Sequence, residues 1–246
     1  MLLCLHGYGE SEHSFHFLED HLPHSWKLVA IDLPWHGKTQ WKEKKDFTVT
    51  DLVQIIDTIL AAQNMPGSPF SLLGFSMGGR MSLSMLQQIP QRISKMILLA
   101  PDGLKVNGWY WLSTQTYLGN SLFHFTMNYP GWLFGLLRIG HWLGFINRSV
   151  YKFTSHYVHD RSMRRQLYLR WTGMRRIKPD LHIIKKKIAA NKITVQLVYG
   201  EYDRIIRHER GEKFRKGIET YCTVQVIASG HQLLQEKNAA LITGLL

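Results

Sequence analysis

The sequence is short of cysteine, of acidic residues and of long apolar runs. It has two cysteines in 246 residues, Cys4 and Cys222, each inside a short apolar run and neither at metal-ligand spacing with a neighbour. Two cysteines are too few for a disulfide-stabilised small scaffold or a cysteine metal site. We expect both to be buried thiols, which suits a reducing compartment.

No apolar run is long enough to span a bilayer. The most apolar stretch, residues 131–146, contains Arg138 and His141 and falls short of the roughly 20 residues that a spanning helix needs. Met1 leads directly into a short strand-like run, without the basic start and apolar core of a signal peptide. We therefore expect a cytoplasmic protein that does not cross a membrane.

Acidic residues are outnumbered, with 18 Asp and Glu against 30 Lys and Arg and a net charge of +12. Basic surfaces attract phosphate polymers, but the basic residues after Arg161 form no recognisable nucleic-acid motif and are mixed with aromatics. We expect no nucleic-acid partner. The basic face is expected to be solvated, or to attract anionic substrates or the head groups of an anionic membrane surface. The sequence leaves the oligomeric state open.

Six short apolar runs predict strands that are covered on both faces, because their apolar residues are continuous rather than alternating. They are residues 2–5, 28–31, 70–73, 96–99, 193–199 and 223–227. Residues 51–60 place apolar side chains at helical spacing, and we expect Thr50 to be the N-cap of this helix. Strands that alternate with helices predict an α/β fold with a mainly parallel central sheet flanked by helices.

The alternation breaks between about residues 103 and 179, where aromatic residues are dense and no strand is recognisable. We expect residues 103–179 to form a helical cap, inserted into a core of residues 1–102 and 180–246. It should lie over the ends of the strands, where open α/β folds bind ligands. Most of its aromatics should form the insertion's own core, and a few, among them Trp109 and Trp111, should line a substrate pocket.

Ser76 lies in the sequence Gly-Phe-Ser-Met-Gly at residues 74–78, between an apolar run and a helix-like segment. This spacing predicts a sharp turn from strand to helix, in which the glycines let both elements pack closely and the serine is held in strained geometry. A serine hydroxyl alone is a weak nucleophile. The chain must therefore also supply a base, an acid that orients it and an oxyanion site.

His231 and Asp203 are the expected partners of the serine, because each follows one of the last two predicted strands. The chain order is thus serine, aspartate, histidine. Asp102 follows the strand after Ser76 and is the main alternative for the acid, although a Pro-Asp-Gly turn explains it without catalysis. Glu201 is close enough to Asp203 to compete. We favour Asp203 because the loop after the penultimate strand is the usual source of this carboxylate.

The oxyanion site requires two backbone N–H groups aimed at the substrate's carbonyl oxygen. We expect one from Met77, at the start of the helix after the nucleophile, and one from Tyr8, in the loop after the first strand. His6 should hold that loop in shape by hydrogen bonding. The segment 32–39 could be mistaken for a metal or catalytic cluster, and we interpret it as a structured turn.

Five motifs in order carry a resemblance: His6-Gly7 and the segments 32–37, 74–79, 199–203 and 230–231. Together they resemble the α/β-hydrolase superfamily, in its single-domain branch with a helical cap, over nearly the whole chain outside the insertion. The resemblance implies that fold and its serine, aspartate and histidine chemistry. Relatives usually begin with a β-hairpin before the strand that leads to His-Gly, whereas this chain opens inside that strand.

The sequence thus predicts a serine hydrolase that cleaves a small-molecule carboxylic ester or thioester with an apolar acyl or alcohol part. This chemistry requires no cofactor and no metal. Two alternatives stay open. The motif from Gly74 to Arg80 is similar to that of the menaquinone-pathway synthase, which favours carbon–carbon cleavage or elimination on a small anionic substrate held by Arg80. The other is a silent lipid- or partner-binding module, against which the intact triad argues.

Overall fold

Six parallel strands form the central sheet, in the order β2-β1-β3-β4-β5-β6. Their bounds are β1 Leu2–Leu5, β2 Leu28–Ile31, β3 Phe70–Phe75, β4 Ile93–Leu99, β5 Thr194–Gly200 and β6 Cys222–Ile227. Every residue of β1 and β3 is buried, as the continuous apolar runs predict. The prediction that all six strands are covered on both faces is wrong for β6, where residues 223–227 are exposed or half-buried because this strand lies at the edge of the sheet. The predicted α/β fold with a parallel sheet is confirmed, and both cysteines are buried thiols.

The structure, a computed structural model, describes residues 1–142 and 158–246. The described residues form two compact units. The first unit comprises residues 1–41, 48–105 and 177–246 and contains the sheet; the second comprises residues 42–47 and 106–176. Within the described residues, no helix combines the length and the apolarity needed to cross a bilayer.

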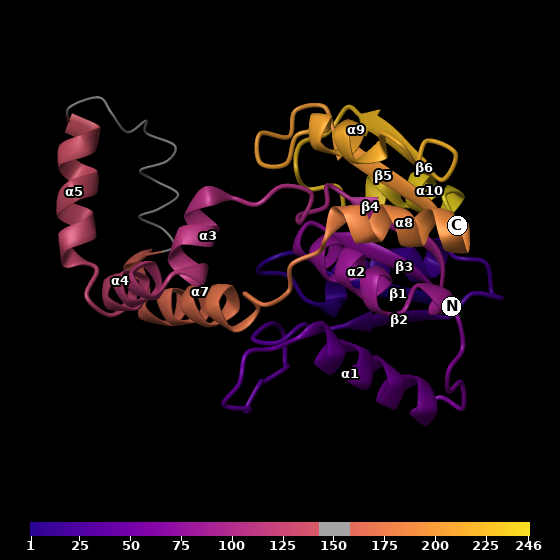
Figure 1. Ribbon diagram of the computed structural model, residues 1–246, viewed down its shortest axis with the longest axis horizontal. Helices are drawn as coiled ribbons and strands as arrows, with labels where there is room; N and C mark the ends of the chain where they lie inside the picture. Colours follow the sequence, from indigo (N-terminus) through magenta and orange to yellow (C-terminus); the bar gives the residue numbers. More distant parts are fainter. Residues whose placement is uncertain (143–157) are drawn as a thin grey trace. The chain divides into compact units, whose positions relative to one another are not determined.

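Helices cover both faces of the sheet in the first unit. They are η1 Glu12–His21, α1 Val49–Ala62, α2 Met77–Gln88, η2 Pro90–Arg92, α8 Leu181–Asn191, α9 Glu209–Arg215, η3 Glu236–Asn238 and α10 Ala239–Gly244. Right-handed crossovers between parallel strands put α1, α2, α8 and α9 on one face and η1 with α10 on the other. The packing agrees, since α2 contacts α1 and α8 while α10 contacts η1. Figure 1 shows α2 and α8 lying over the strands.

The N-cap of α1 lies two residues before the N-cap expected at Thr50. Thr48 is the N-cap: its side chain accepts a hydrogen bond from the Asp51 backbone N–H, and the Asp51 carboxylate accepts one from the Thr48 backbone N–H. This reciprocal pair is a capping box, and it satisfies two N–H groups where an N-cap at Thr50 would satisfy one. Thr50 lies inside the helix, and its hydroxyl accepts from Gln88.

The second unit contains four described helices: α3 Gly108–Gln115, α4 Tyr117–Asn128, α5 Gly131–Trp142 and α7 Arg161–Gly173. Arg164 is buried there and holds helix ends together, since its guanidinium donates to the carbonyl oxygens of Met127 at 2.8 Å and Val158 at 2.7 Å. Part of the expected cap, residues 143–157, lies outside the described residues.

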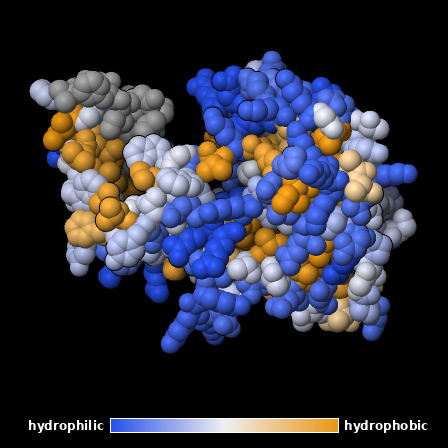
Figure 2. Space-filling view, in the orientation of Figure 1, coloured by the Kyte–Doolittle hydropathy of each residue, from blue (hydrophilic) through white to orange (hydrophobic). Residues whose placement is uncertain are grey.

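The expectation that most aromatics of the insertion form its own core is wrong for the described residues. No aromatic side chain that the structure describes between 106 and 176 is fully buried, and the exposed fractions reach 77% at Trp109 and 83% at Trp142. Short helices enclose too little volume to bury large rings. Figure 2 shows hydrophobic residues gathered on the part of the second unit that carries α4 and α5.

The segment 42–47 clusters with the second unit, although its place in the sequence predicts that it belongs to the core. Asp46 explains this, because its carboxylate accepts from the guanidinium groups of Arg175 at 2.9 Å and Arg176 at 3.0 Å. The Phe47 N–H also donates to the Gly173 carbonyl oxygen at 2.7 Å. These partners lie far apart in the sequence, so no local pattern predicts them.

Candidate active site

Ser76 occupies the tight turn between β3 and α2, in the strained geometry that its motif predicts. Its φ of 48° and ψ of −111° cost of order 1–3 kcal/mol for a residue with a side chain. Three backbone hydrogen bonds hold the turn. The Ser76 N–H donates to the Leu99 carbonyl oxygen, and the Ser76 carbonyl oxygen accepts from the N–H groups of Gly79 and Asp102, each at 2.9 Å.

The glycines on either side of Ser76 permit close packing, as predicted. A Cβ atom at Gly78 would lie 1.8 Å from the carbonyl oxygen of Leu5, the last residue of β1. A Cβ atom at Gly74 would lie 2.6 Å from the Ser82 hydroxyl. Helix α2 can therefore start directly against the sheet, which places Ser76 at the carboxyl edge of the strands.

The structure brings the predicted serine, histidine and aspartate together. His231 Nε2 lies 3.2 Å from Ser76 Oγ, and His231 Nδ1 lies 2.7 Å from Asp203 Oδ2. When the Asp203 carboxylate accepts a hydrogen bond from Nδ1–H, Nε2 presents its lone pair to the serine hydroxyl. The arrangement can therefore transfer a proton from Ser76 to His231.

Asp203 is itself fixed in place. Its side chain is fully buried, and its second oxygen, Oδ1, accepts the backbone N–H groups of Ile205 at 2.7 Å and Ile206 at 2.9 Å. One oxygen thus anchors the carboxylate to its own loop, and the other is left for His231. This rigid support orients the imidazole.

The competing carboxylates have other positions. Asp102 Oδ2 lies 3.6 Å from Arg80 Nε, and Asp102 Oδ1 accepts the Gly103 N–H at 2.8 Å. This is the Pro-Asp-Gly turn that the sequence suggested as the non-catalytic interpretation. Glu201 is exposed. Of the three candidate acids, Asp203 is the one whose oxygen contacts His231.

The expected oxyanion donors lie at the ends of β1 and β3. Met77 is the first residue of α2, and the first N–H groups of a helix have no partner inside it. Tyr8 follows β1, and its ring packs edge-on against His36, with ring centroids 5.9 Å apart. The placement of both residues agrees with an oxyanion site beside Ser76.

Glu10 is a residue that sequence reasoning missed. Its Oε2 accepts the Gly7 N–H at 3.1 Å, and its Oε1 accepts the Gln232 side-chain amide at 2.7 Å. One carboxylate thus joins the loop that carries Tyr8 to the loop that carries His231. The only signal in the sequence is an acidic residue close to the His-Gly motif, which is too common to single out.

His6 and the segment 32–39 have the structural roles that were expected. The ring of His6 is buried and bonds the Gly7 carbonyl oxygen through Nδ1 at 2.7 Å and the Leu33 N–H through Nε2 at 3.0 Å. Asp32 accepts the backbone N–H groups of Glu12 and Lys38, each at 2.9 Å. The described residues contain no cluster of histidine, cysteine and carboxylate groups that could hold a metal.

The three residues suggested for substrate binding differ in their surroundings. Arg80 is buried on α2 and forms the ion pair with Asp102. Trp109 and Trp111 lie on α3 in the second unit, with 77% and 49% of their surface exposed. Their role in binding stays a prediction.

Comparison with known proteins identifies the family. The model of the alpha/beta hydrolase fold matches residues 1–237. The chain belongs to the α/β-hydrolase fold family. As a member of this family it is an enzyme, a hydrolase, and its sheet of parallel strands between helices is the family's architecture.

The α/β-hydrolase relatives include two proteins of Bacillus subtilis strain 168. The uncharacterised hydrolase YugF is 26% identical over 257 aligned residues, which cover 96% of this chain and 85% of YugF. A protein provisionally named 2-succinyl-6-hydroxy-2,4-cyclohexadiene-1-carboxylate synthase is 35% identical over 113 residues, which cover 44% of this chain and 39% of that protein.

Among solved structures, a thermophilic esterase from Thermogutta terrifontis superposes with a TM-score of 0.69 at 14% identity. The superposition covers 99% of this chain and 87% of the esterase. At this identity the likeness shows the fold alone.

Proposed function

We propose that the protein is a serine hydrolase that cleaves a carboxylic ester or thioester through an acyl-enzyme. The observation that carries the proposal is the continuous contact from Asp203 through His231 to Ser76, at 2.7 Å and 3.2 Å. A nucleophile, a base and an orienting acid in this geometry are the elements of acyl transfer. The strained backbone of Ser76 holds its hydroxyl in place for attack.

Two balanced steps follow from this geometry. In the first, Ser76 Oγ bonds to the substrate's carbonyl carbon while His231 Nε2 takes the hydroxyl proton. The tetrahedral intermediate collapses, the bond to the alcohol or thiol breaks, and His231 returns the proton to that leaving group. In the second, His231 takes a proton from water, which attacks the acyl-enzyme, and the carboxylic acid leaves as Ser76 regains its proton.

The negative charge on the carbonyl oxygen in each tetrahedral intermediate requires donors. We assign this role to the backbone N–H groups of Tyr8 and Met77, with the start of α2 adding the positive end of its dipole. Loss of one such donor typically costs about 2.7–4 kcal/mol of transition-state stabilisation. A side-chain substitution cannot delete a backbone donor. Glu10 holds the loop that carries Tyr8, so substitution of Glu10 is the practical way to perturb this donor.

We infer an apolar acyl or alcohol part from the second unit. Its surface offers aromatic rings such as Trp109 and Trp111, which are exposed and suited to contact a hydrocarbon group. A hydrocarbon group that packs against such rings is removed from water. Each substrate methylene enclosed in this way contributes about 0.8 kcal/mol to the binding free energy.

A panel of p-nitrophenyl esters graded by acyl length, with the wild type beside Ser76→Ala, tests the proposal. We expect hydrolysis that rises with acyl length and a loss of at least about a thousandfold in Ser76→Ala. Trp109→Ala and Trp111→Ala should flatten the dependence on acyl length. Turnover that survives in Ser76→Ala would contradict the proposed nucleophile.

A second candidate function is carbon–carbon cleavage or elimination on a small anionic substrate. The observation that favours it is the 35% identity to the B. subtilis protein provisionally named as a cyclohexadiene-carboxylate synthase. This function would require Arg80 to bind the anionic substrate. The ion pair with Asp102 argues against that role, because the Asp102 carboxylate already balances the charge of Arg80. A large loss of synthase activity in Arg80→Ala, with ester turnover near background in the wild type, would favour this candidate over ester hydrolysis.

A further inference from the structure

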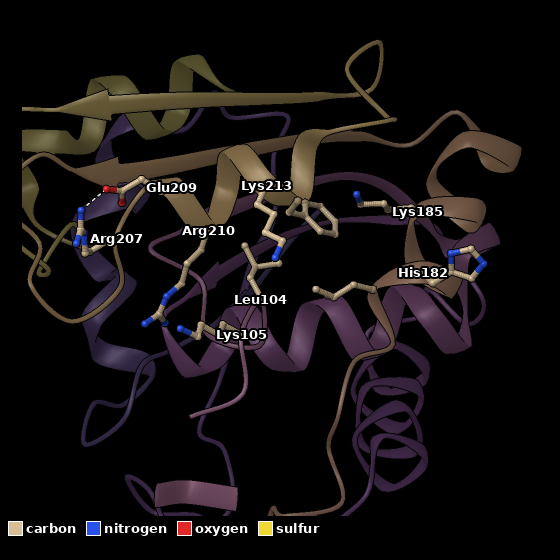
Figure 3. A pocket seen from close by; sticks show the side chains of 10 residues that line it. Leu104, Lys105, His182, Lys185, Arg207, Glu209, Arg210 and Lys213 are labelled. Atoms are coloured by element: carbon tan, nitrogen blue, oxygen red, sulfur yellow. Dashed lines mark hydrogen bonds and ion pairs between the residues drawn. The ribbon is translucent and has the colours of Figure 1, made fainter. Parts of the chain in front are cut away.

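A basic pocket of about 740 Å³ lies in the first unit, between α8 and α9. Its lining residues are Leu104, Lys105, Leu181, His182, Lys185, Arg207, Glu209, Arg210, Lys213 and Phe214. The name "basic pocket" is used below for this set. In Figure 3, Arg210 and Lys213 extend from α9 toward Leu104 and Lys105.

The charge of the basic pocket is strongly one-sided. Five lysine and arginine side chains and one carboxylate line it. That carboxylate, Glu209, is paired with Arg207, so it leaves the other cations unbalanced. Within the part of the chain that the structure describes, no ion pair is formed by Lys105, Arg210 or Lys213. Like charges that line one pocket repel one another, and a bound anion would reduce that cost.

Apolar side chains form part of the pocket wall. Leu104 and Phe214 are buried, with 9% and 2% of their surface exposed. Lys185 Nζ lies 5.6 Å from the centroid of the Phe214 ring and donates to the Lys216 carbonyl oxygen at 2.7 Å. These buried apolar side chains form the floor beneath the cationic groups, and a volume of about 740 Å³ suits an anion attached to a larger organic group more than a small bare ion.

The basic pocket lies at the same edge of the sheet as the nucleophile. Lys105 is three residues after Asp102, whose N–H donates to the Ser76 carbonyl oxygen. Three residues of extended chain span at most about 11 Å. Arg207 follows Asp203 by four residues at the carboxyl end of β5, on the loop that supplies the proposed triad acid. Two cations of the pocket, Lys105 and Arg207, are therefore carried on loops that also hold the proposed site.

We propose that the basic pocket binds the phosphates of a nucleotide carried on the leaving group of the substrate. This inference rests on the proposed acyl transfer and names its substrate class: an acyl thioester or ester whose thiol or alcohol half ends in a phosphorylated nucleoside. Lysine and arginine recognise phosphate oxygens through charge-assisted hydrogen bonds, and the remaining volume of the pocket receives the nucleoside. When Ser76 is acylated, the thiol that departs with the proton from His231 carries these phosphates away.

Two thioesters with one acyl group test the inference kinetically. Butyryl-coenzyme A carries the phosphorylated nucleotide, and S-butyryl-pantetheine has the same thioester without it. We expect wild-type kcat/KM to favour butyryl-coenzyme A by about tenfold or more, mainly through KM. The ratio of the two kcat/KM values should fall toward one in Arg210→Ala/Lys213→Ala. The control Lys237→Ala removes an exposed lysine of η3 outside the pocket and should keep it. Equal use of both thioesters by the wild type overturns the inference and leaves the proposed function standing.

Direct binding separates failure of the pocket from failure of the chemistry. Coenzyme A is titrated into the full chain in a calorimeter. We expect its dissociation constant to rise with salt concentration, and to be at least about tenfold higher in Arg210→Ala/Lys213→Ala than in the wild type. This result would uphold the pocket even if Ser76 proved inactive toward esters. Absence of coenzyme A binding overturns it.

Vesicles distinguish a nucleotide phosphate from a lipid head group. Phosphatidylserine and phosphatidylcholine vesicles present anionic phosphates on a surface without a nucleoside. We expect the Arg210→Ala/Lys213→Ala variant to bind them as the Lys237→Ala control does. Vesicle binding that depends on Arg210 and Lys213, without coenzyme A binding, would assign the pocket to a membrane surface and overturn the inference.

Discussion

Replacing Asp203 by asparagine should leave the fold and remove most of the activity. Asp203 Oδ1 accepts two backbone N–H groups, from Ile205 and Ile206, and Oδ2 faces His231 Nδ1. Asparagine keeps the first oxygen and places its NH₂ group against the imidazole. A donor at this position forces Nδ1 to be the acceptor, so the ring proton moves to Nε2, which then cannot take the proton of Ser76.

The expected loss is about 10⁴-fold in kcat, by analogy with the effect of the wrong tautomer in other triads, which equals about 5.4 kcal/mol of activation free energy. Asp203→Ala should lose activity and stability together. It leaves the buried Ile206 N–H without its acceptor, which costs about 1–3 kcal/mol, and the part-buried Ile205 N–H adds less.

Steady-state hydrolysis of p-nitrophenyl butyrate gives kcat, and urea denaturation gives the free energy of unfolding. Asp102→Asn is the matched control, because Asp102 contacts Arg80 and its own turn, and we expect a change in kcat of less than about tenfold. The reasoning is refuted if Asp203→Asn keeps more than a hundredth of the wild-type kcat. A loss of activity in Asp102→Asn that exceeds the loss in Asp203→Asn would transfer the acid's role to Asp102.

Three further predictions address the supports of the site. Glu10→Gln should lower kcat about tenfold, because an amide cannot accept hydrogen bonds from both Gly7 and Gln232. The double variant Glu10→Gln/Gln232→Glu should restore kcat, and a double variant no more active than the single one contradicts this prediction. Gly78→Ala should lower the free energy of unfolding by at least about 1–3 kcal/mol in urea denaturation, whereas unchanged stability would refute the close packing of α2. Burial raises the pKa of Cys222 from near 9 to about 12, so the free energy of unfolding should fall as the pH rises between these values. Iodoacetamide at pH 8 should alkylate this thiol only after the protein unfolds. Rapid alkylation of Cys222 in the folded protein would contradict the prediction.

Local patterns in the sequence predicted the sheet and the contacts around Ser76. Buried strands leave continuous apolar runs, and the glycines at 74 and 78 mark the place where β3 and α2 must touch. The capping box of α1 also has a local signal, since Asp51 stands three residues after Thr48, but Thr50 is nearer to the apolar residues and resembles an N-cap as well. Ser76, Asp203 and His231 meet because each follows a strand that ends at the same edge of the sheet.

Contacts between distant segments could not be predicted in this way. Glu10 meets Gln232 across 222 positions, and Asp46 meets Arg175 across 129. The basic pocket is assembled from Lys105, α8 and α9, each of which is an ordinary charged segment by itself. The burial of the aromatic residues could not be predicted either. Their density in the sequence does not reveal whether the folded unit is large enough to bury them.

Covalent labelling tests the central claim about Ser76 most directly. A fluorophosphonate probe reacts with a serine hydroxyl that is activated by a neighbouring base. Intact-mass spectrometry of the treated full chain should show one adduct, and peptide mapping should place it on Ser76. Labelling should be lost in Ser76→Ala and strongly slowed in His231→Ala, while both variants retain the wild-type circular dichroism spectrum. A folded wild type that takes up no probe, or a Ser76→Ala variant that is labelled equally well, would contradict the assignment of Ser76 as the nucleophile.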